Sequence, residues 1–261
     1  MDENFQTYLN RAMRTILPDT YRTQVQNIQE SPKFKPDGTG GLTAQPFPGY
    51  TVITPPGQED DEDNHPLFAS LEHLQKHLTD ALGTEMFVAL PPSSFHLTVA
   101  DMIWAHAFEH ASADAKFEPQ LRDLMGRIFQ ECAPLQQGPQ ISLRVLGLMV
   151  MPRAIAACLV PTDEPSYDRL LKFRRTIYQN RELMGLGIEQ QYYFTPHITL
   201  GYFGNVTHLP DRASAADAII DLNHQWLDQD PQFFTVTRAE LRKFDDMTRY
   251  YREPDWAMFQ F

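Results

Sequence analysis

Apolar side chains recur along the chain at two different spacings. Five leucines follow one another every three or four residues between positions 67 and 82, which predicts an amphipathic helix over 66–82. The same spacing predicts helices at about 4–17, 117–132, 167–183 and 211–228. Short runs of β-branched, aliphatic and aromatic residues predict strands at 50–54, 86–90, 94–104, 141–152, 154–161, 192–204, 233–244 and 256–261.

The order of these elements favours an α+β fold. Adjacent strands are joined by short turns, as between 141–152 and 154–161, so we expect largely antiparallel sheets with helices packed on one face. Residues 31–49 are rich in Pro and Gly, which predicts an extended loop lying over the body of the protein. At 261 residues, the chain is expected to form one domain with two lobes.

Composition and charge exclude several classes of protein. With 42% apolar and 11% aromatic residues, the chain can bury a large core and is neither disordered nor fibrous. Its formal net charge of -12 has the wrong sign for an extended nucleic-acid-binding surface, although a few local donors can still hold one phosphate group. The sequence shows no signal-peptide layout and no apolar run long enough to span a membrane, so a cytoplasmic protein is expected. Cys132 and Cys158 are expected to be reduced packing residues, and the acidic run at 55–66 a solvated loop.

Two of the predicted strands carry the same pair of polar residues. HLTV at 96–99 and HITL at 197–200 each place an imidazole and a hydroxyl two residues apart. In a strand, such a pair lies on one face while apolar residues occupy the other. HLT at 77–79 has the same letters but lies in a predicted helix, where two residues turn by about 200° and the side chains diverge. A single such strand is explained by a core histidine bonded to a backbone carbonyl. Two of them are explained more simply by one shared cleft.

A cleft lined by two histidines and two threonines suits phosphodiester chemistry. Imidazole titrates near neutral pH, so His96 and His197 can divide the roles of general base and general acid. Thr98 and Thr199 would donate hydrogen bonds to the nonbridging phosphate oxygens. A catalytic zinc needs a third protein ligand, and Asp101 is expected on the strand face opposite His96. The sequence therefore predicts neither a metal nor another cofactor.

The two motifs resemble those of the 2H phosphoesterase superfamily, which includes RNA 2',3'-cyclic phosphodiesterases and 2'-5' RNA ligase-like proteins. The stretches FPGYTVITP (47–55) and PPSSFHLTV (91–99) look most like a poorly characterised bacterial and fungal subgroup. The resemblance implies two pseudo-symmetric lobes, each with an antiparallel sheet and outer helices, and a cleft between them that holds both histidines. Residues 50–261 would form this bilobal domain. Residues 1–49 would be an N-terminal helix and Pro/Gly-rich extension, absent from compact members, that covers the cleft or fixes the substrate range.

The resemblance also implies an activity. It is metal-independent hydrolysis of a cyclic 2',3'-type or 2'-5' linked nucleotide or RNA-end phosphate, with His197 as the base and His96 as the acid. Two alternatives stay open: a nucleotide or RNA-end binding protein without turnover, and a 2'-5' RNA ligase-like transesterase. In each case the expected partner is a small nucleotide or RNA end, with no membrane involved, and the protein is expected to be a monomer.

Further residues are candidates for substrate binding. Tyr193 and Tyr202 flank the second motif and are candidates for stacking on a base. Arg144 and Arg153, on the central hairpin, are candidates for phosphate binding. Lysines 33 and 35 become candidates only if the N-terminal loop folds over the site.

Overall fold

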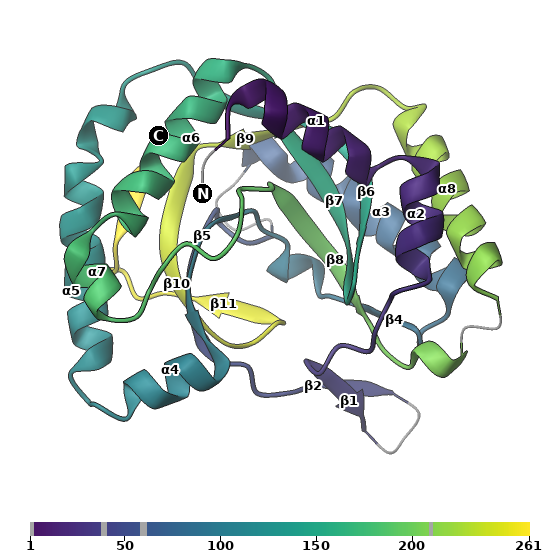
Figure 1. The fold of residues 1–261 in the computed structure, drawn as a ribbon, viewed down its shortest axis with the longest axis horizontal. Coiled ribbons are helices and arrows are strands. Elements are labelled where there is room, and N and C mark those ends of the chain that lie inside the picture. The colour runs from purple at the N-terminus through teal and green to yellow at the C-terminus, as the bar shows by residue number, and fades with distance from the viewer. Residues whose placement is uncertain (1–2, 38–40, 58–61, 209–210) are drawn as a thin grey trace.

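The computed structural model describes residues 3–37, 41–57, 62–208 and 211–261. Residues 58–61 of the predicted acidic loop lie outside this part of the chain. The described helices and strands form two lobes, each with an antiparallel sheet and helices on its outer side (Figure 1). The predicted α+β class and its two-lobed arrangement are therefore confirmed.

The first lobe is built on a five-stranded sheet with the order β11-β10-β3-β5, in which β12 also pairs with β10. Its strands are β3 (Gly49–Ile53), β5 (Thr98–Trp104), β10 (Arg238–Asp246), β11 (Arg249–Tyr251) and β12 (Met258–Gln260). The helices on this side are α4 (Ala105–Ser112), α5 (Phe117–Glu131), α6 (Glu164–Tyr178) and α7 (Arg181–Gly185) (Figure 1). Apolar side chains of these helices and of the sheet form one buried cluster, as the amphipathic spacing predicts.

The second lobe has a five-stranded sheet with the order β4-β8-β7-β6-β9. Its strands are β4 (Phe87–Ala89), β6 (Ile141–Met151), β7 (Ala154–Pro161), β8 (His197–Phe203) and β9 (Phe233–Val236). Four helices cover it: α1 (Phe5–Thr15), α2 (Pro18–Val25), α3 (His65–Leu82) and α8 (Arg212–Leu227) (Figure 1). The leucines of the predicted helix at 66–82 are mostly buried here in a second apolar cluster.

The chain passes repeatedly between the two lobes. The predicted strand at 233–244 is in fact two strands that separate at Thr237: β9 pairs with β6 in the second sheet, and β10 pairs with β3 in the first. The predicted helix at 167–183 also divides, because the Asn180 side chain caps the new helix α7 by accepting from two of its backbone N–H groups. As a result of these crossings, the two motif strands β5 and β8 belong to different sheets.

The N-terminal segment packs against the second lobe. Tyr8 and Tyr21 are fully buried, and their hydroxyls donate to the backbone carbonyls of Leu159 (3.2 Å) and Leu148 (2.6 Å). The predicted extended loop at 31–49 contains a short antiparallel hairpin, formed by β1 (Phe34–Pro36) and β2 (Leu42–Ala44). The apolar spacing did not predict α2 (Pro18–Val25), α4 or β11, because each is short and lacks a long periodic pattern.

Candidate active site

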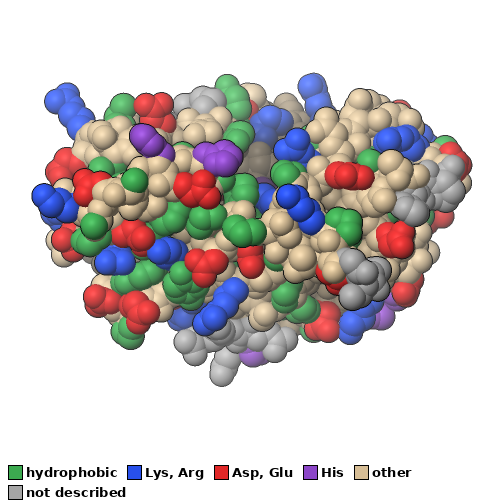
Figure 2. Space-filling model, turned by 90° about the horizontal axis from the view of Figure 1, so that it is seen from below, with side chains coloured by type: hydrophobic (Ala, Val, Ile, Leu, Met, Phe, Trp, Pro, Cys, Tyr) green, Lys and Arg blue, Asp and Glu red, His purple; other side chains and the backbone are tan. Residues whose placement is uncertain are grey.

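One cavity brings the two motifs together. It has a volume of about 520 Å³, and residues of both sheets line it, including His96, Thr98, His197 and Thr199. On the face drawn in Figure 2, a recess opens near the upper edge and Lys and Arg side chains lie around it. The cavity volume falls within the usual range for small-ligand sites, roughly 300–1,000 Å³.

β-Bulges decide which side chains of the motif strands line this cavity. In β5, the pairing with β3 skips two residues, Val99 and Met102. In β8, the pairing with β7 skips Leu200. Each skipped residue shifts the alternation of the strand by one position. The cavity is consequently lined by positions 98, 101 and 104 of β5 and by positions 197, 199 and 202 of β8.

Asp101 faces the cavity, which corrects the expectation that it lies on the opposite side from His96. That expectation assumed an unbroken strand over 94–104, whereas β5 begins at Thr98 and carries a bulge before Asp101. Burial raises the pKa of Asp101, and the positive charges of Arg174, His197 and Lys33 act against this rise. Asp101 is thus a cavity residue that simple strand periodicity misses.

The two histidines are held by equivalent hydrogen bonds. Nδ1 of His96 lies 2.7 Å from the carbonyl oxygen of Ser94, and Nδ1 of His197 lies 2.7 Å from the carbonyl oxygen of Thr195. In each case the acceptor is two residues before the histidine, and a carbonyl can only accept, so Nδ1 carries the proton. Nε2 of each ring is left as the nitrogen available to a ligand in the cavity.

The two rings have different surroundings. Burial lowers the pKa of His96 from 6.5 to about 4, and the charges of His197 and Arg242 act in the same direction, while the bond to Ser94 opposes the change. The His96 ring packs against the ring of Tyr250, with centroids 4.3 Å apart. At neutral pH, His96 is therefore uncharged in the free protein.

Cationic residues from outside the motifs also line the cavity. Lys33 lies just before β1, and its ammonium group donates to the Tyr202 hydroxyl (3.2 Å) between the rings of Phe47 (4.5 Å) and Tyr202 (4.7 Å). Lys35 is exposed and lies outside the cavity lining. Arg174 of α6 lines the cavity and is buried, and its Nη1 donates to the carbonyl oxygen of Val99.

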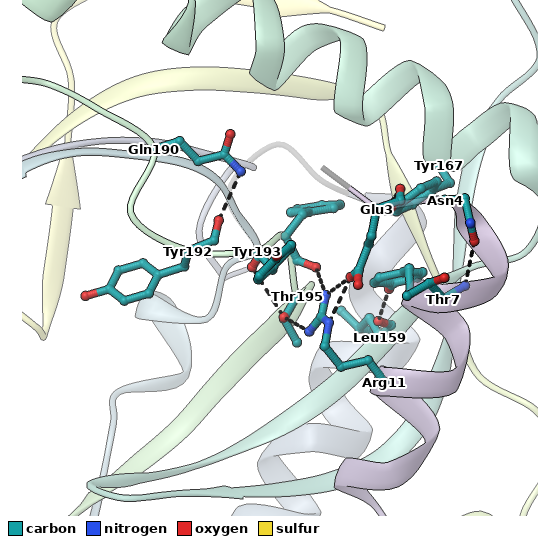
Figure 3. Close-up of polar contacts among 12 residues, drawn as sticks. Glu3, Asn4, Thr7, Arg11, Leu159, Tyr167, Gln190, Tyr192, Tyr193 and Thr195 are labelled. Atoms are coloured by element: carbon teal, nitrogen blue, oxygen red, sulfur yellow. Dashed lines mark hydrogen bonds and ion pairs between the residues drawn. The ribbon is translucent and has the colours of Figure 1, made fainter. Parts of the chain in front are cut away.

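Arg11 of α1 connects the N-terminal segment to the second motif (Figure 3). Its Nη1 donates to the hydroxyl of Thr195 (2.6 Å), and its Nη2 donates to the carbonyl oxygen of Phe194 (2.8 Å). Nε donates to the Glu3 carboxylate (2.8 Å), which also forms an ion pair with Nη2. The guanidinium therefore supports the segment whose carbonyl holds His197. Arg11 lies more than 180 residues before that segment, so its role could not be predicted from the residues around the motif.

The predicted substrate-binding residues divide into two groups. Tyr193 and Tyr202 line the cavity, and Tyr193 is about half exposed. Arg144 lines a different, small cavity next to Trp226, and Arg153 lies on the surface, where it donates to Gln29 (3.3 Å). The structure does not bring these two arginines to the motif residues, because β6 carries Arg144 away from the cavity and Arg153 lies in the turn between β6 and β7.

The described ranges of the chain contain neither a cluster of metal ligands nor a membrane-spanning helix. No group of three or more His, Cys, Asp or Glu side chains with the geometry of a metal site occurs among those residues. None of the described helices has the length and apolar character needed to cross a bilayer. Both cysteines are buried and free.

A family model matches the part of the chain that carries the first motif. Residues 33–113, which include the first motif, match the family model "2H-phosphodiest: Domain of unknown function (DUF1868)". This confirms the predicted resemblance to 2H phosphoesterases over that part of the chain. No curated protein matches.

One of the solved structures that match this chain has a similar architecture. The conserved protein of unknown function ATU0111 from Agrobacterium tumefaciens has a TM-score of 0.52 and 15% identity, covering 85% of this chain and 90% of its own. It has the same fold. E. coli LigT complexed with 3'-AMP has a TM-score of 0.39 and 15% identity over 83% of this chain and 98% of its own. A structure described as a phosphoesterase has a TM-score of 0.37 and 16% identity over 79% and 94%.

Proposed function

We propose that this protein is a metal-independent phosphodiesterase that hydrolyses a cyclic 2',3'-type or 2'-5' linked nucleotide phosphate. The observation that carries this proposal is the equivalent placement of two histidines in one cavity, each with Nδ1 bound to a carbonyl and Nε2 available. Thr98 and Thr199 line the same cavity and supply hydroxyl donors for the nonbridging oxygens. The family match over residues 33–113 supports a phosphoesterase-type activity.

The electrostatics of the cavity favour His96 as the base and His197 as the acid, the reverse of the roles that the resemblance implies. His96 is uncharged in the free protein at neutral pH, so it is ready to accept a proton from water. Burial disfavours the charged form of His96, and the charges of His197 and Arg242 add to this effect, whereas the carboxylate of Asp101 lies near His197.

The reaction then proceeds in one displacement. His96 takes a proton from a water molecule, whose oxygen attacks phosphorus in line. The bond from phosphorus to the ribose oxygen breaks, and His197 gives its proton to that oxygen. The products are a phosphate monoester and a free ribose hydroxyl. His96 ends protonated and His197 neutral, so solvent returns both rings to their starting states.

The test is hydrolysis of the four 2',3'-cyclic nucleotides and a 2'-5' linked dinucleotide by the native protein, His96→Ala and His197→Ala. Each variant is expected to lose about 10³-fold in kcat, within the usual range for removal of a general acid or base. His77→Ala is the matched control, because His77 belongs to the HLT sequence on α3 and is exposed. Full activity in either motif variant, at unchanged stability, would refute the proposal.

Two other outcomes define the alternatives. Stoichiometric calorimetric binding of a nucleotide by the native protein, without product after hours, would identify a binding protein. Formation of a new diester in the presence of a ribose hydroxyl, followed by phosphorus NMR, would identify a ligase-like transesterase.

A further inference from the structure

The two halves of the cavity differ at one equivalent position. The fifth residue after each motif histidine lines the cavity: Asp101 in β5 and Tyr202 in β8. The Tyr202 hydroxyl accepts a hydrogen bond from the ammonium group of Lys33. Beyond the threonines, the cavity therefore has a carboxylate on one wall and a phenol with a lysine on the other.

Asp101 is the only acidic side chain among the described residues that line this cavity. Within the described part of the chain, its carboxylate forms neither an ion pair nor a hydrogen bond to another side chain. Burial raises the pKa of Asp101 overall, and the nearby charges of Arg174, His197 and Lys33 oppose part of this rise. A carboxylate placed inside a cavity in this way has acceptor capacity left for a ligand, because an ionised carboxylate offers about four lone-pair sites.

The neighbouring arginine, Arg174, donates no hydrogen bond to the Asp101 carboxylate. Arg174 donates through Nη1 to the carbonyl oxygen of Val99, and its guanidinium lies over the rings of Phe194 (4.7 Å) and Tyr178 (5.3 Å). Its Nε is buried without a hydrogen-bond partner. Lys33 is likewise held by Tyr202 and by the Phe47 ring. Asp101 and these cations therefore lie in one cavity without hydrogen bonds between them.

We propose that this end of the cavity recognises the base edge of a guanine nucleotide. Asp101 would accept from the two adjacent donors of guanine, N1–H and the 2-amino group, and Lys33 would donate to its O6 carbonyl. The aromatic rings of Phe47 and Tyr250 also line the cavity. This assignment rests on the proposed function, in that it places the phosphate at the motif residues.

The other common bases fit the same groups less well. Adenine and cytosine each present one amino donor beside a ring nitrogen that only accepts. Uracil presents one N–H between two carbonyls, whose lone pairs would face the carboxylate. Only guanine offers two adjacent donors to one carboxylate with a carbonyl beside them. A ligand that leaves a buried polar group of the site without a hydrogen-bond partner binds much more weakly.

The test is calorimetric binding of guanosine, inosine, xanthosine, adenosine, cytidine and uridine monophosphates to the native protein and to Asp101→Asn. Native protein is expected to bind the guanosine nucleotide about tenfold more tightly than the inosine nucleotide, which lacks the 2-amino group, and about 100-fold more tightly than the xanthosine nucleotide. In Asp101→Asn, the amide offers one acceptor and one donor, which match N1–H and the O2 carbonyl of xanthine. The preference between guanosine and xanthosine nucleotides should therefore reverse.

Lysines 33 and 35 provide a matched pair of variants. Lys33→Met keeps the aliphatic contact with Phe47 but removes the donor, so we expect about tenfold weaker binding of the guanosine nucleotide. Lys35→Met removes the same charge from an exposed position two residues later and should leave binding unchanged.

Several results would overturn the inference. They are equal binding of all bases by the native protein, preference for another base, or an equal loss for every nucleotide in Asp101→Asn, which would indicate a structural role. The binding measurements need no turnover. Guanosine preference without hydrolysis of any diester would refute the proposed function and leave this inference standing. Equal hydrolysis and equal binding of all four cyclic nucleotides would refute the inference alone.

Discussion

The two motifs hold their histidines with the same hydrogen bond but support that bond in different ways. In the first motif, the acceptor carbonyl belongs to Ser94, which ends a 3-10 turn (Pro92–Ser94). Both the N–H and the hydroxyl of Ser94 donate to the carbonyl oxygen of Pro91, at 2.8 and 2.7 Å. In the second motif, the acceptor carbonyl belongs to Thr195, whose hydroxyl is held by Arg11 from α1. One half of the site is therefore supported locally, and the other depends on the N-terminal segment.

The two halves also differ in charge. Burial lowers the pKa of His96, and the charge of Arg242 acts in the same direction; the His96 ring packs against Tyr250. His197 lies near the carboxylate of Asp101. The two motifs are nearly identical in sequence, but their imidazole rings have different electrostatic environments. An acid and a base that act at the same pH require such a difference.

The strongest test of this difference compares leaving groups. On a 2',3'-cyclic nucleotide, His96→Ala and His197→Ala should each lose about 10³-fold in kcat. On a p-nitrophenyl ester of a nucleoside phosphate, the departing p-nitrophenolate needs no proton. His197→Ala should therefore stay within about tenfold of the native rate on this ester, whereas His96→Ala should lose about as much as before. The opposite pattern would show that His96 is the acid.

The sequence predicted the shared cleft because it depends on two strong local signals. Apolar alternation around each His-x-Thr pair places imidazole and hydroxyl on one side, and the structure brings both pairs to one cavity. Helical spacing of the leucines likewise predicted α3 almost to its ends. These features depend only on residues that are close in the sequence.

The remaining features depend on contacts between distant residues. The bulges that turn Asp101 towards the cavity are set by the pairing of β5 with β3, which the spacing of β5 alone does not show. Arg11 and Lys33 reach the cavity because the N-terminal segment packs on the second lobe. The division of the predicted strand at Thr237 likewise follows from pairing with two different sheets. Tertiary pairing, not local propensity, decides each of these positions.

A second test concerns the lowered pKa of His96. Between pH 6.5 and about 4, the unfolded chain binds a proton at His96 that the folded protein does not bind, so the free energy of unfolding should fall as the pH falls through this range. Below about pH 4 the contribution stays constant. The full contribution is at most about 3 kcal/mol.

Urea unfolding at several pH values between 7 and 4 measures this effect. His96→Gln removes the titrating group while keeping a side chain of similar polarity, so its stability should depend less steeply on pH than that of the native protein over this range. Identical pH dependence in the two proteins would show that His96 has an ordinary pKa, and it would remove the main argument for His96 as the base.

The smallest expected effect concerns the long-range support of the second motif. Arg11→Met should remove the donors to Thr195 and Phe194 and leave His197 less firmly oriented. We expect kcat to fall about tenfold, because small displacements of a catalytic group are costly, while KM stays nearly unchanged. Arg14→Met is the control, because Arg14 lies on the same helix and is exposed.

The separate effects of Arg11→Met on kcat and on KM show whether Arg11 positions His197 or binds the substrate. A raised KM at constant kcat would mean that Arg11 contacts the substrate directly, since it lines the cavity. Unchanged kcat and KM would mean that the segment before β8 holds His197 without help from α1. In that case the two motifs would be supported equally well by local structure, and the N-terminal segment would affect the site only through Lys33 and its neighbours in the cavity wall.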